Sequence, residues 1–405
     1  MQPLLHFTPA ASHYHRHRQL IRTFINARIK WVRDPYLDTA IEKEKNLKPL
    51  LLLKTLIISQ PFQTIPLSTV SPLKPHLHLP TTAQKFIEKY PSIFKMFLPP
   101  GKTMPLPHVK LTPKALSLHH EETLMLRLSH YRKDVAERLA KLLMLARGLK
   151  IPLDLIDLFK YDLGLPHDYL LTLLPEFPEY FQISDMGFRD SSGNVVLVLD
   201  LVSWRKELAI SAMEKRAQSE GESKSRVKFL MNLPRGFDLE KRVMEWVEDW
   251  QNLPYISPYE NAFHLVSNSD QAEKWAVGVI HELLSLLLSK KTERENIFRL
   301  GEFLGFTRLR FKKALVHFPG IFYVSNKIRM QTVFLREKYK KNLLIERHPL
   351  MGMRYKYINL MNRVLRRGKP IRSGFVGRKK GNSLSKGGRR KGDDNRYSID
   401  DENDE

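Results

Sequence analysis

The sequence has 405 residues, 42% of them hydrophobic, and a formal net charge of +24 at pH 7. A chain of this length can bury a core in two or three domains, and so large a positive excess favours a polyanionic partner. The absence of cysteine excludes disulfides, thiolate zinc sites and cysteine hydrolases, and no apolar run is long enough to span a membrane.

The positive charge is uneven along the chain. Residues 1–33 hold six Lys and Arg and no acid, and residues 366–391 hold eleven basic residues and no acid. Residues 393–405 hold seven acids and one arginine. Between these ends, residues 34–365 hold 49 basic and 36 acidic residues. We therefore expect the folded body to be basic in its own right.

The N-terminal segment, residues 1–33, is predicted to be an organellar transit peptide. On a helix, Arg18 and Arg22 would share one side, turned away from Leu20 and Phe24. A secretory signal would instead need a continuous apolar centre. Arginine outweighs hydroxyl residues here, which favours the mitochondrion, with the chloroplast as the alternative destination. A disordered basic tail is the other interpretation of this segment.

Apolar residues that recur at three- and four-residue steps predict the main helices. In chain order these cover residues 36–60, 82–90, 121–147, 238–250 and 272–290. The first helix should start at an N-cap, Asp38, and be divided at Pro49. The third should end at Gly148.

Three stretches lack the signals of a packed helix. Residues 61–80 are rich in proline and predict a loop. Residues 211–226 are almost devoid of apolar side chains and predict an exposed linker or a charged helix end. The tail, residues 366–405, is basic and then acidic with almost nothing to bury, and we expect it to be disordered.

A short motif occurs three times: an aromatic residue, proline, any residue, a bulky apolar residue and phenylalanine. Its copies are Tyr90–Phe94, Phe177–Phe181 and Phe318–Phe322. Gly164 and Gly305 lie 14 residues before the proline of the second and third copies. Such a glycine ends one helix, and the proline stops a second. The final Phe of each copy is expected to fill the core.

A strand–turn–strand pattern follows each motif. The second copy predicts strands at residues 181–183 and 195–199, and the third at 322–324 and 332–335. The first copy has a longer excursion, with a return strand expected at residues 115–118.

Two helices followed by a hairpin resemble a winged-helix layout. The predicted fold is therefore α+β and mainly helical, with three divergent helix–turn–helix plus β-hairpin units in one elongated body. The units lie near residues 36–120, 121–210 and 238–345.

These units and the segments around them resemble the plant organelle RNA recognition (PORR) domain family, over about residues 28–365. The segments that carry the resemblance are Trp31–Asp38, Glu42–Leu50, Tyr90–Phe94, Gly236–Glu240 with Trp246 and Trp250, Leu253–Tyr259 and Phe318–Ser325. The resemblance implies a nuclear-encoded plant protein sent to mitochondria or chloroplasts, where it binds group II intron RNA and promotes splicing. It implies no catalytic residue, metal or cofactor.

Lysine and arginine near phosphates provide RNA affinity, and aromatic or arginine side chains stack on unpaired bases. On this chemistry alone the candidate RNA-binding residues are Arg308, Arg310, Lys312, Lys313, Lys327, Arg329, Arg354, Tyr355, Lys356, Tyr357, Arg363, Arg366 and Arg367. The first four lie on the second helix of the third unit, and the next two at its hairpin tip. Since the four cations surround their helix instead of forming one stripe, an ordinary charged surface is the alternative for any one of them.

Catalysis is not expected. Asp154, Asp157 and Asp162 are separated by apolar residues, and His119 and His120 are adjacent, not four residues apart as on a metal-binding helix. We therefore predict a non-enzymatic splicing factor, without a membrane or a small-molecule substrate. Its partners would be organellar intron-containing RNA and other splicing factors in a ribonucleoprotein. The alternative function is a structural protein associated with organellar ribosomes or other RNPs, without intron specificity.

Overall fold

The computed structural model describes residues 31–100, 106–189, 193–221, 227–233, 240–328 and 330–367. The chain divides into two compact units, Met1–Arg366 and Arg367–Glu405, and nearly all described residues belong to the first. The fold of these residues is α+β and mainly helical, with small antiparallel sheets, as predicted. The predicted transit peptide and the predicted disordered tail lie outside the described residues, except at residues 31–33 and 366–367.

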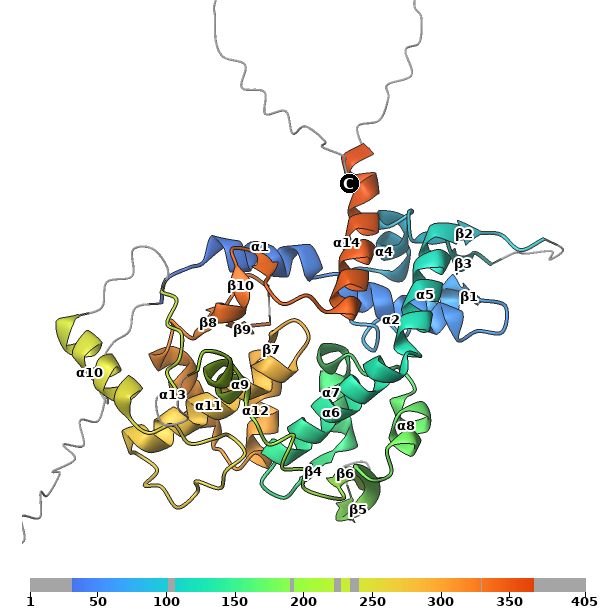
Figure 1. Cartoon of the computed structure of the whole chain (residues 1–405). Helices are drawn as coiled ribbons and strands as arrows, with labels where there is room; N and C mark the ends of the chain where they lie inside the picture. The colour runs from blue at the N-terminus through green and yellow to red at the C-terminus, as the bar shows by residue number, and fades with distance from the viewer. Residues whose placement is uncertain are drawn as a thin grey trace, which may run out of the picture. The chain divides into compact units, whose positions relative to one another are not determined.

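Three successive parts of the chain, called repeats below, follow one order of elements: helix, short strand, two helices and a hairpin (Figure 1). The first repeat comprises α2 (Leu47–Ile58), β1 (Thr64–Pro66), α3 (Leu67–Val70), α4 (Ala83–Lys89), β2 (Phe94–Phe97) and β3 (His108–Leu111). The second comprises α6 (Ser129–Leu145), β4 (Lys150–Pro152), α7 (Leu153–Leu163), α8 (Tyr169–Thr172), the 3-10 helix η1 (Leu174–Glu176), β5 (Phe181–Arg189) and β6 (Val195–Leu201). The third comprises α11 (Asp270–Leu286), β7 (Lys291–Glu293), α12 (Arg294–Phe303), α13 (Arg308–His317), β8 (Phe322–Ser325) and β9 (Thr332–Leu335).

The strand order is the same in the three sheets. The short first strand pairs with the last strand of the hairpin, which gives the orders β1-β3-β2, β4-β6-β5 and β7-β9-β8. All of these pairings are antiparallel. The hairpins predicted after the second and third copies of the motif are confirmed.

The backbone repeats as well. A residue with positive φ stands directly before the first strand of each repeat; these residues are Gln63, Leu149 and Lys290, with φ of 51°, 53° and 51°. A second such residue follows the next helix; these residues are His78, Gly164 and Gly305, with φ of 51°, 75° and 83°. The prediction that the two glycines end helices is confirmed.

The remaining elements connect or cover the repeats. They are α1 (Pro35–Glu44), α5 (Pro113–Leu126), α9 (Ala212–Ser219), α10 (Lys241–Asn252), the 3-10 helix η3 (Arg336–Lys338), the β10–β11 pair (Tyr339–Lys340 and Leu343–Leu344) and α14 (Pro349–Arg367).

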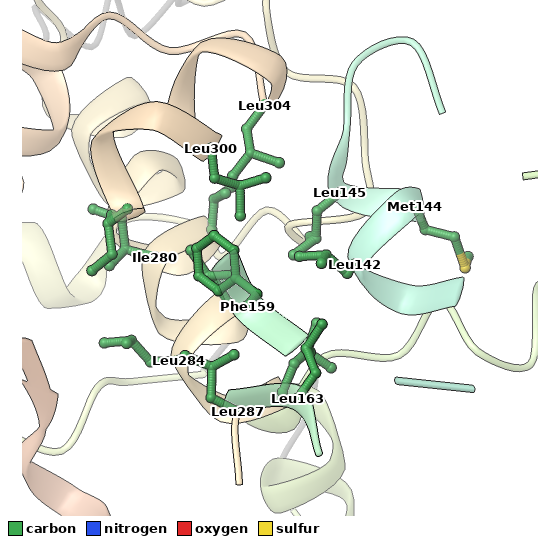
Figure 2. Close-up of a cluster of buried hydrophobic side chains, with 14 of the residues drawn as sticks. Leu142, Met144, Leu145, Phe159, Leu163, Ile280, Leu284, Leu287, Leu300 and Leu304 are labelled. Carbon is green, nitrogen blue, oxygen red and sulfur yellow. The ribbon is translucent and has the colours of Figure 1, made fainter. Parts of the chain in front are cut away.

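Two clusters of buried side chains make up most of the core. The larger unites the second and third repeats through leucines and Phe159 from α6, α7, α11 and α12, as Figure 2 shows. The smaller lies in the first repeat and receives Tyr357, Ile358, Leu360 and Met361 from α14. Because α14 also contributes Leu350 and Met353 to the larger cluster, it connects the two.

The helices predicted at residues 82–90, 238–250 and 272–290 are confirmed as α4, α10 and α11, apart from their ends. The helix predicted at residues 36–60 is divided, but between α1 and α2 and not at Pro49. Pro49 is tolerated in the first turn of α2, where backbone N–H groups have no helical acceptor. The N-cap of α1 is Asp34, whereas Asp38 is buried.

Two predictions for residues 61–120 were wrong. The loop at residues 61–80 contains β1 and α3, and the return strand expected at residues 115–118 is part of α5. Thr112 caps α5 and Pro113 occupies its first turn, which fixes a helix start just after β3.

The helix predicted at residues 121–147 is shared between α5 and α6, and α6 ends at Leu145, with Ala146 as its C-cap, not at Gly148. Of the two interpretations of residues 211–226, the charged helix holds for residues 212–219, which form α9, begun by a capping box of Ser211 and Glu214.

Candidate nucleic-acid interface

The four predicted cations of the third repeat lie on α13, which begins at the N-cap Thr307. Arg308 is held by Glu295 through two hydrogen bonds of 2.8 and 2.7 Å, and its guanidinium lies 4.8 Å from the ring of Phe298. Its side chain is still 56% exposed. A phosphate that contacted Arg308 would have to compete with this carboxylate.

Arg310 is placed differently. Its half-buried guanidinium lies 5.6 Å from the ring of Phe306. Its Nε and Nη2 atoms are buried and have no hydrogen-bond partner among the described residues. Burial lowers the pKa of Arg310, while the nearby Glu273 opposes this. With Lys313, Arg310 lines a cavity of about 420 Å³, called the α13 cavity below.

Lys312 faces another part of the surface. It lines a smaller cavity of about 190 Å³ together with Trp31 and Asn326. Lys327, in the turn between β8 and β9, pairs with Glu42 at 3.1 Å. Arg329 lies outside the described residues. The structure therefore brings Arg310 and Lys313 together but separates them from Lys312.

Two of the candidates on α14 are buried, which corrects the assignment of Tyr357 to RNA contact. Arg354 is 4% exposed, its guanidinium lies 3.8 Å from the ring of Tyr161, and it donates to the Tyr161 carbonyl. Tyr357 is fully buried, and its hydroxyl donates to Glu122 at 3.1 Å. Tyr357 cannot reach RNA without unfolding of α14, whereas Arg354 lines a cavity of about 570 Å³.

The other α14 candidates lie nearer the surface. Tyr355 is half-buried, Lys356 is exposed and pairs with Glu121 at 2.6 Å, and Arg363 is exposed. Arg366 and Arg367 belong to the last turn of α14, but their side chains are not among the described ones. Of this set, Arg363 is the exposed cation best able to contact a phosphate.

A larger cavity of about 570 Å³, called the α7 cavity below, is lined by α2, α5 and α7. Lys48 and Arg127 line it, and neither forms an ion pair with any residue in the described part of the chain. Lys160 also lines it, and burial lowers the pKa of this lysine. Sequence reasoning missed these residues because they come from three helices far apart in the chain.

In the lining of the α7 cavity, Lys54 and Glu122 form an ion pair in which both side chains are largely buried. Burial alone would raise the pKa of Glu122, but the nearby His119, the charge of Lys54 and a hydrogen bond from Tyr357 lower it to about 2. Glu122 is therefore ionised, and its charge is balanced by Lys54. Asp157 and Asp168 also line the cavity, together with the cations Lys48, Arg127, Arg132 and Lys160.

The acids considered for catalysis do not converge. Asp162 accepts a hydrogen bond of 2.6 Å from Thr292, and Asp154 pairs with Arg299 at 3.6 Å. Within the described residues, no group of three or more His, Cys, Asp or Glu side chains could hold a metal ion. A search of the same residues finds no helix with the length and apolar character needed to cross a membrane.

Comparison with known proteins gives one family match, to the plant organelle RNA recognition domain over residues 32–366. The chain is 35% identical over 347 residues to protein WHAT'S THIS FACTOR 9, mitochondrial, from Arabidopsis thaliana, a match that covers 84% of this chain and 86% of the relative. It is 31% identical over 347 residues to the maize protein WHAT'S THIS FACTOR 1, chloroplastic, covering 82% of this chain and 66% of the relative. It is also 31% identical over 333 residues to protein ROOT PRIMORDIUM DEFECTIVE 1 of Arabidopsis thaliana, covering 78% of each. No solved structure matches the chain.

Proposed function

Because this chain belongs to the plant organelle RNA recognition domain family, we propose that it binds organellar RNA and promotes the splicing of group II introns. The observation that carries the proposal is the family match, which extends over almost the whole described chain. The cations at the two larger cavities support it, since Lys48, Arg127, Arg310 and Lys313 form no ion pair in the described chain and could pair with RNA phosphates.

The protein would act by holding RNA, not by catalysis. We assign the three repeats to the winged-helix type, because each has a strand that joins the hairpin to form a three-stranded sheet against two helices. The proposed contacts are Lys48, Arg127, Arg310 and Lys313 at the cavities and Arg363 on α14. Arg308, Lys312, Lys327 and Lys356 would add affinity at the periphery, and other splicing factors would share the RNA.

We further propose that the protein acts in mitochondria. The relative with 35% identity is named as mitochondrial, although others are named as chloroplastic. Trp31 donates a hydrogen bond of 3.1 Å to the Val324 carbonyl and stacks on Tyr323 with ring centroids 6.2 Å apart. Cleavage of a transit peptide should therefore occur before Trp31, not after residue 33. Residues 1–30 fused to a fluorescent protein should enter mitochondria; import into chloroplasts instead would contradict this assignment.

Immunoprecipitation of the full chain from plant organelles, followed by sequencing of the bound RNA, tests the function. We expect enrichment of a few intron-containing precursors, and loss of the protein should leave those same introns unspliced. Uniform recovery of ribosomal RNA with ribosomal proteins, and normal splicing without the protein, would favour the ribosome-associated alternative and contradict the proposal.

A further inference from the structure

The second and third repeats correspond position by position. Helices α6 and α11 both have 17 residues, and they begin at Ser129 and Asp270. Strands β4 and β7 begin at Lys150 and Lys291. In each pair the third-repeat residue stands 141 positions after its counterpart. One structural unit is therefore present twice. The two copies align without insertion or deletion from the first helix (α6 or α11) to the glycine after the second helix (Gly164 or Gly305).

The two copies bind each other reciprocally. The Arg147 N–H donates to the Phe303 carbonyl at 3.0 Å, and the Leu288 N–H donates to the Asp162 carbonyl at 2.8 Å. Arg147 and Leu288 are counterparts under the same offset, as are Asp162 and Phe303. An exchange in which each copy gives and receives the same bond indicates a two-fold relation between them.

The side chains around this exchange follow the same relation. A Cβ on Gly164 would meet Leu288 at 2.5 Å, and a Cβ on its counterpart Gly305 would lie 3.2 Å from Arg147. Figure 2 shows side chains of α6 and α7 packed against those of α11 and α12. Repeats two and three thus form an internal pseudo-dimer.

The two larger cavities are also counterparts. Residues at matching positions line both; the pairs include Arg127 and Asn268, Gly164 and Gly305, and Thr172 and Lys313. The α7 cavity and the α13 cavity are therefore one site that occurs twice. Their volumes, about 570 and 420 Å³, fall in the usual range for ligand pockets.

Each cavity carries two cations that form no ion pair in the described chain: Lys48 and Arg127 in one, Arg310 and Lys313 in the other. Acidic residues line both cavities as well, Asp157 and Asp168 in the first and Asp270 and Glu273 in the second. These cations do not occupy matching positions, so different helices supply the positive charge of the two cavities. In the α13 cavity a phosphate would supply the acceptors that the buried Nε and Nη2 of Arg310 lack. Phe263, which is partly exposed, lines the same cavity and offers an aromatic edge to a base.

We propose that the α7 and α13 cavities are a pair of RNA-strand sites, related by the pseudo-two-fold axis, each of which binds one unpaired segment of the same RNA. This inference rests on the proposed RNA-binding function. It adds the location of the RNA-strand sites and their number, two per chain. Two segments far apart in the transcript would then be brought together by a single chain.

Three variants of the full chain test the pair of sites. Lys48→Ala with Arg127→Ala removes the cations of the α7 cavity, and Arg310→Ala with Lys313→Ala removes those of the α13 cavity. Lys133→Ala with Arg299→Ala is the matched control, because it removes two exposed cations that line neither cavity. The probes are a fluorescent oligouridylate hexamer and a single-stranded RNA of about 40 nucleotides, long enough to reach both sites.

The wild-type chain and the control should bind two hexamers. Each cavity variant should bind one hexamer and lose about tenfold or more in affinity for the long RNA, because bivalent binding is lost. Hexamer stoichiometry that stays at two in both cavity variants, or a single hexamer per wild-type chain, would overturn the paired sites while leaving RNA binding intact. Failure of the wild-type chain to bind either probe would overturn the proposed function as well.

Folding of the variants is checked by thermal unfolding. If Arg310→Ala destabilises the chain, the α13 cavity is tested with Lys313→Ala alone, because Lys313 is an exposed side chain. It should weaken binding of the long RNA by several-fold, and an unchanged affinity would count against that cavity.

Discussion

Arg354 and Tyr357 show what residue type alone cannot predict. A run of arginine, tyrosine and lysine suits RNA contact, yet the same residue types can pack inside when their polar atoms find partners. Here the Tyr161 carbonyl and ring satisfy Arg354, and Glu122 satisfies Tyr357. Which face of α14 is buried depends on the first repeat, some 250 residues earlier in the chain. The neighbouring Lys356 and Arg363, on the other faces, remained exposed as expected.

The ion pair of Lys54 and Glu122 should contribute to stability. Glu122→Ala would leave Lys54 buried without a counter-charge, and we expect the free energy of unfolding to fall by about 3 kcal/mol. Chemical denaturation of the purified chain measures this. Lys54→Met with Glu122→Leu should recover most of the loss, since an apolar pair needs no neutralisation. A single variant as stable as the wild type would contradict the assignment.

The same pair predicts an effect of pH. The folded-state pKa of Glu122 is about 2, below the value of about 4.3 expected in the unfolded chain. Its contribution to the free energy of unfolding is therefore complete above pH 4.3 and is lost as the pH falls towards 2. Denaturation curves at pH 6 and pH 3 should show that the free energy of unfolding falls less between these pH values for Glu122→Gln than for the wild type. An equal loss in both would exclude Glu122 as a source of the acid sensitivity.

At the scale of elements, the glycine and proline signals predicted more than the charge signals did. Gly164 and Gly305 end their helices because the chain turns there through positive φ. By contrast, Leu149, Lys290 and Gln63 take the same backbone conformation without a residue type that announces it. The sequence therefore located the end of the second helix in repeats two and three. It missed the short strands that follow the first helix of each repeat. A three-residue strand such as β1 also has too few positions to show an alternation.

Gly164→Ala tests the packing between repeats. The new Cβ would lie 2.5 Å from Leu288 and would occupy a backbone with φ of 75°. We expect a loss of about 2 kcal/mol in the free energy of unfolding. Gly352→Ala is the control, because this glycine lies within α14 with open space around it, and it should gain about 0.5 kcal/mol. Equal stability of the two variants would argue against close packing at Gly164.

Asp34 should fix α1 to the third repeat. Its carboxylate accepts from the backbone N–H groups of Tyr36 and Leu37 and pairs with Arg336 at 2.7 Å, where the Arg336 side chain is only 6% exposed. Asp34→Ala loses the cap and leaves a buried cation unpaired, at a cost of about 3 kcal/mol. Asp34→Asn keeps the cap, so its free energy of unfolding should fall by less than that of Asp34→Ala. Thermal unfolding separates the two variants, and identical midpoints would contradict the dual role.

For the whole molecule, the motif that occurs three times predicted that a unit recurs, and the structure extends that agreement to complete helices and strands. The cavities could not be predicted. Each is lined by helices or loops whose relation depends on how the repeats pack, and the α7 cavity also takes residues from the first repeat. Sequence patterns describe one element at a time, so a site built from several elements appears only when they are placed together.

The dependence of RNA affinity on salt tests most directly whether the folded body grips the RNA backbone. The full chain is compared with a variant in which Lys48, Arg127, Arg310 and Lys313 are all alanine, over a series of salt concentrations. Removing four phosphate contacts should make the slope of log affinity against log salt shallower by about three for single-stranded RNA. The Lys133→Ala, Arg299→Ala control should keep the wild-type slope. A four-site variant with the slope and affinity of the wild type would show that the cations of the cavities do not hold RNA.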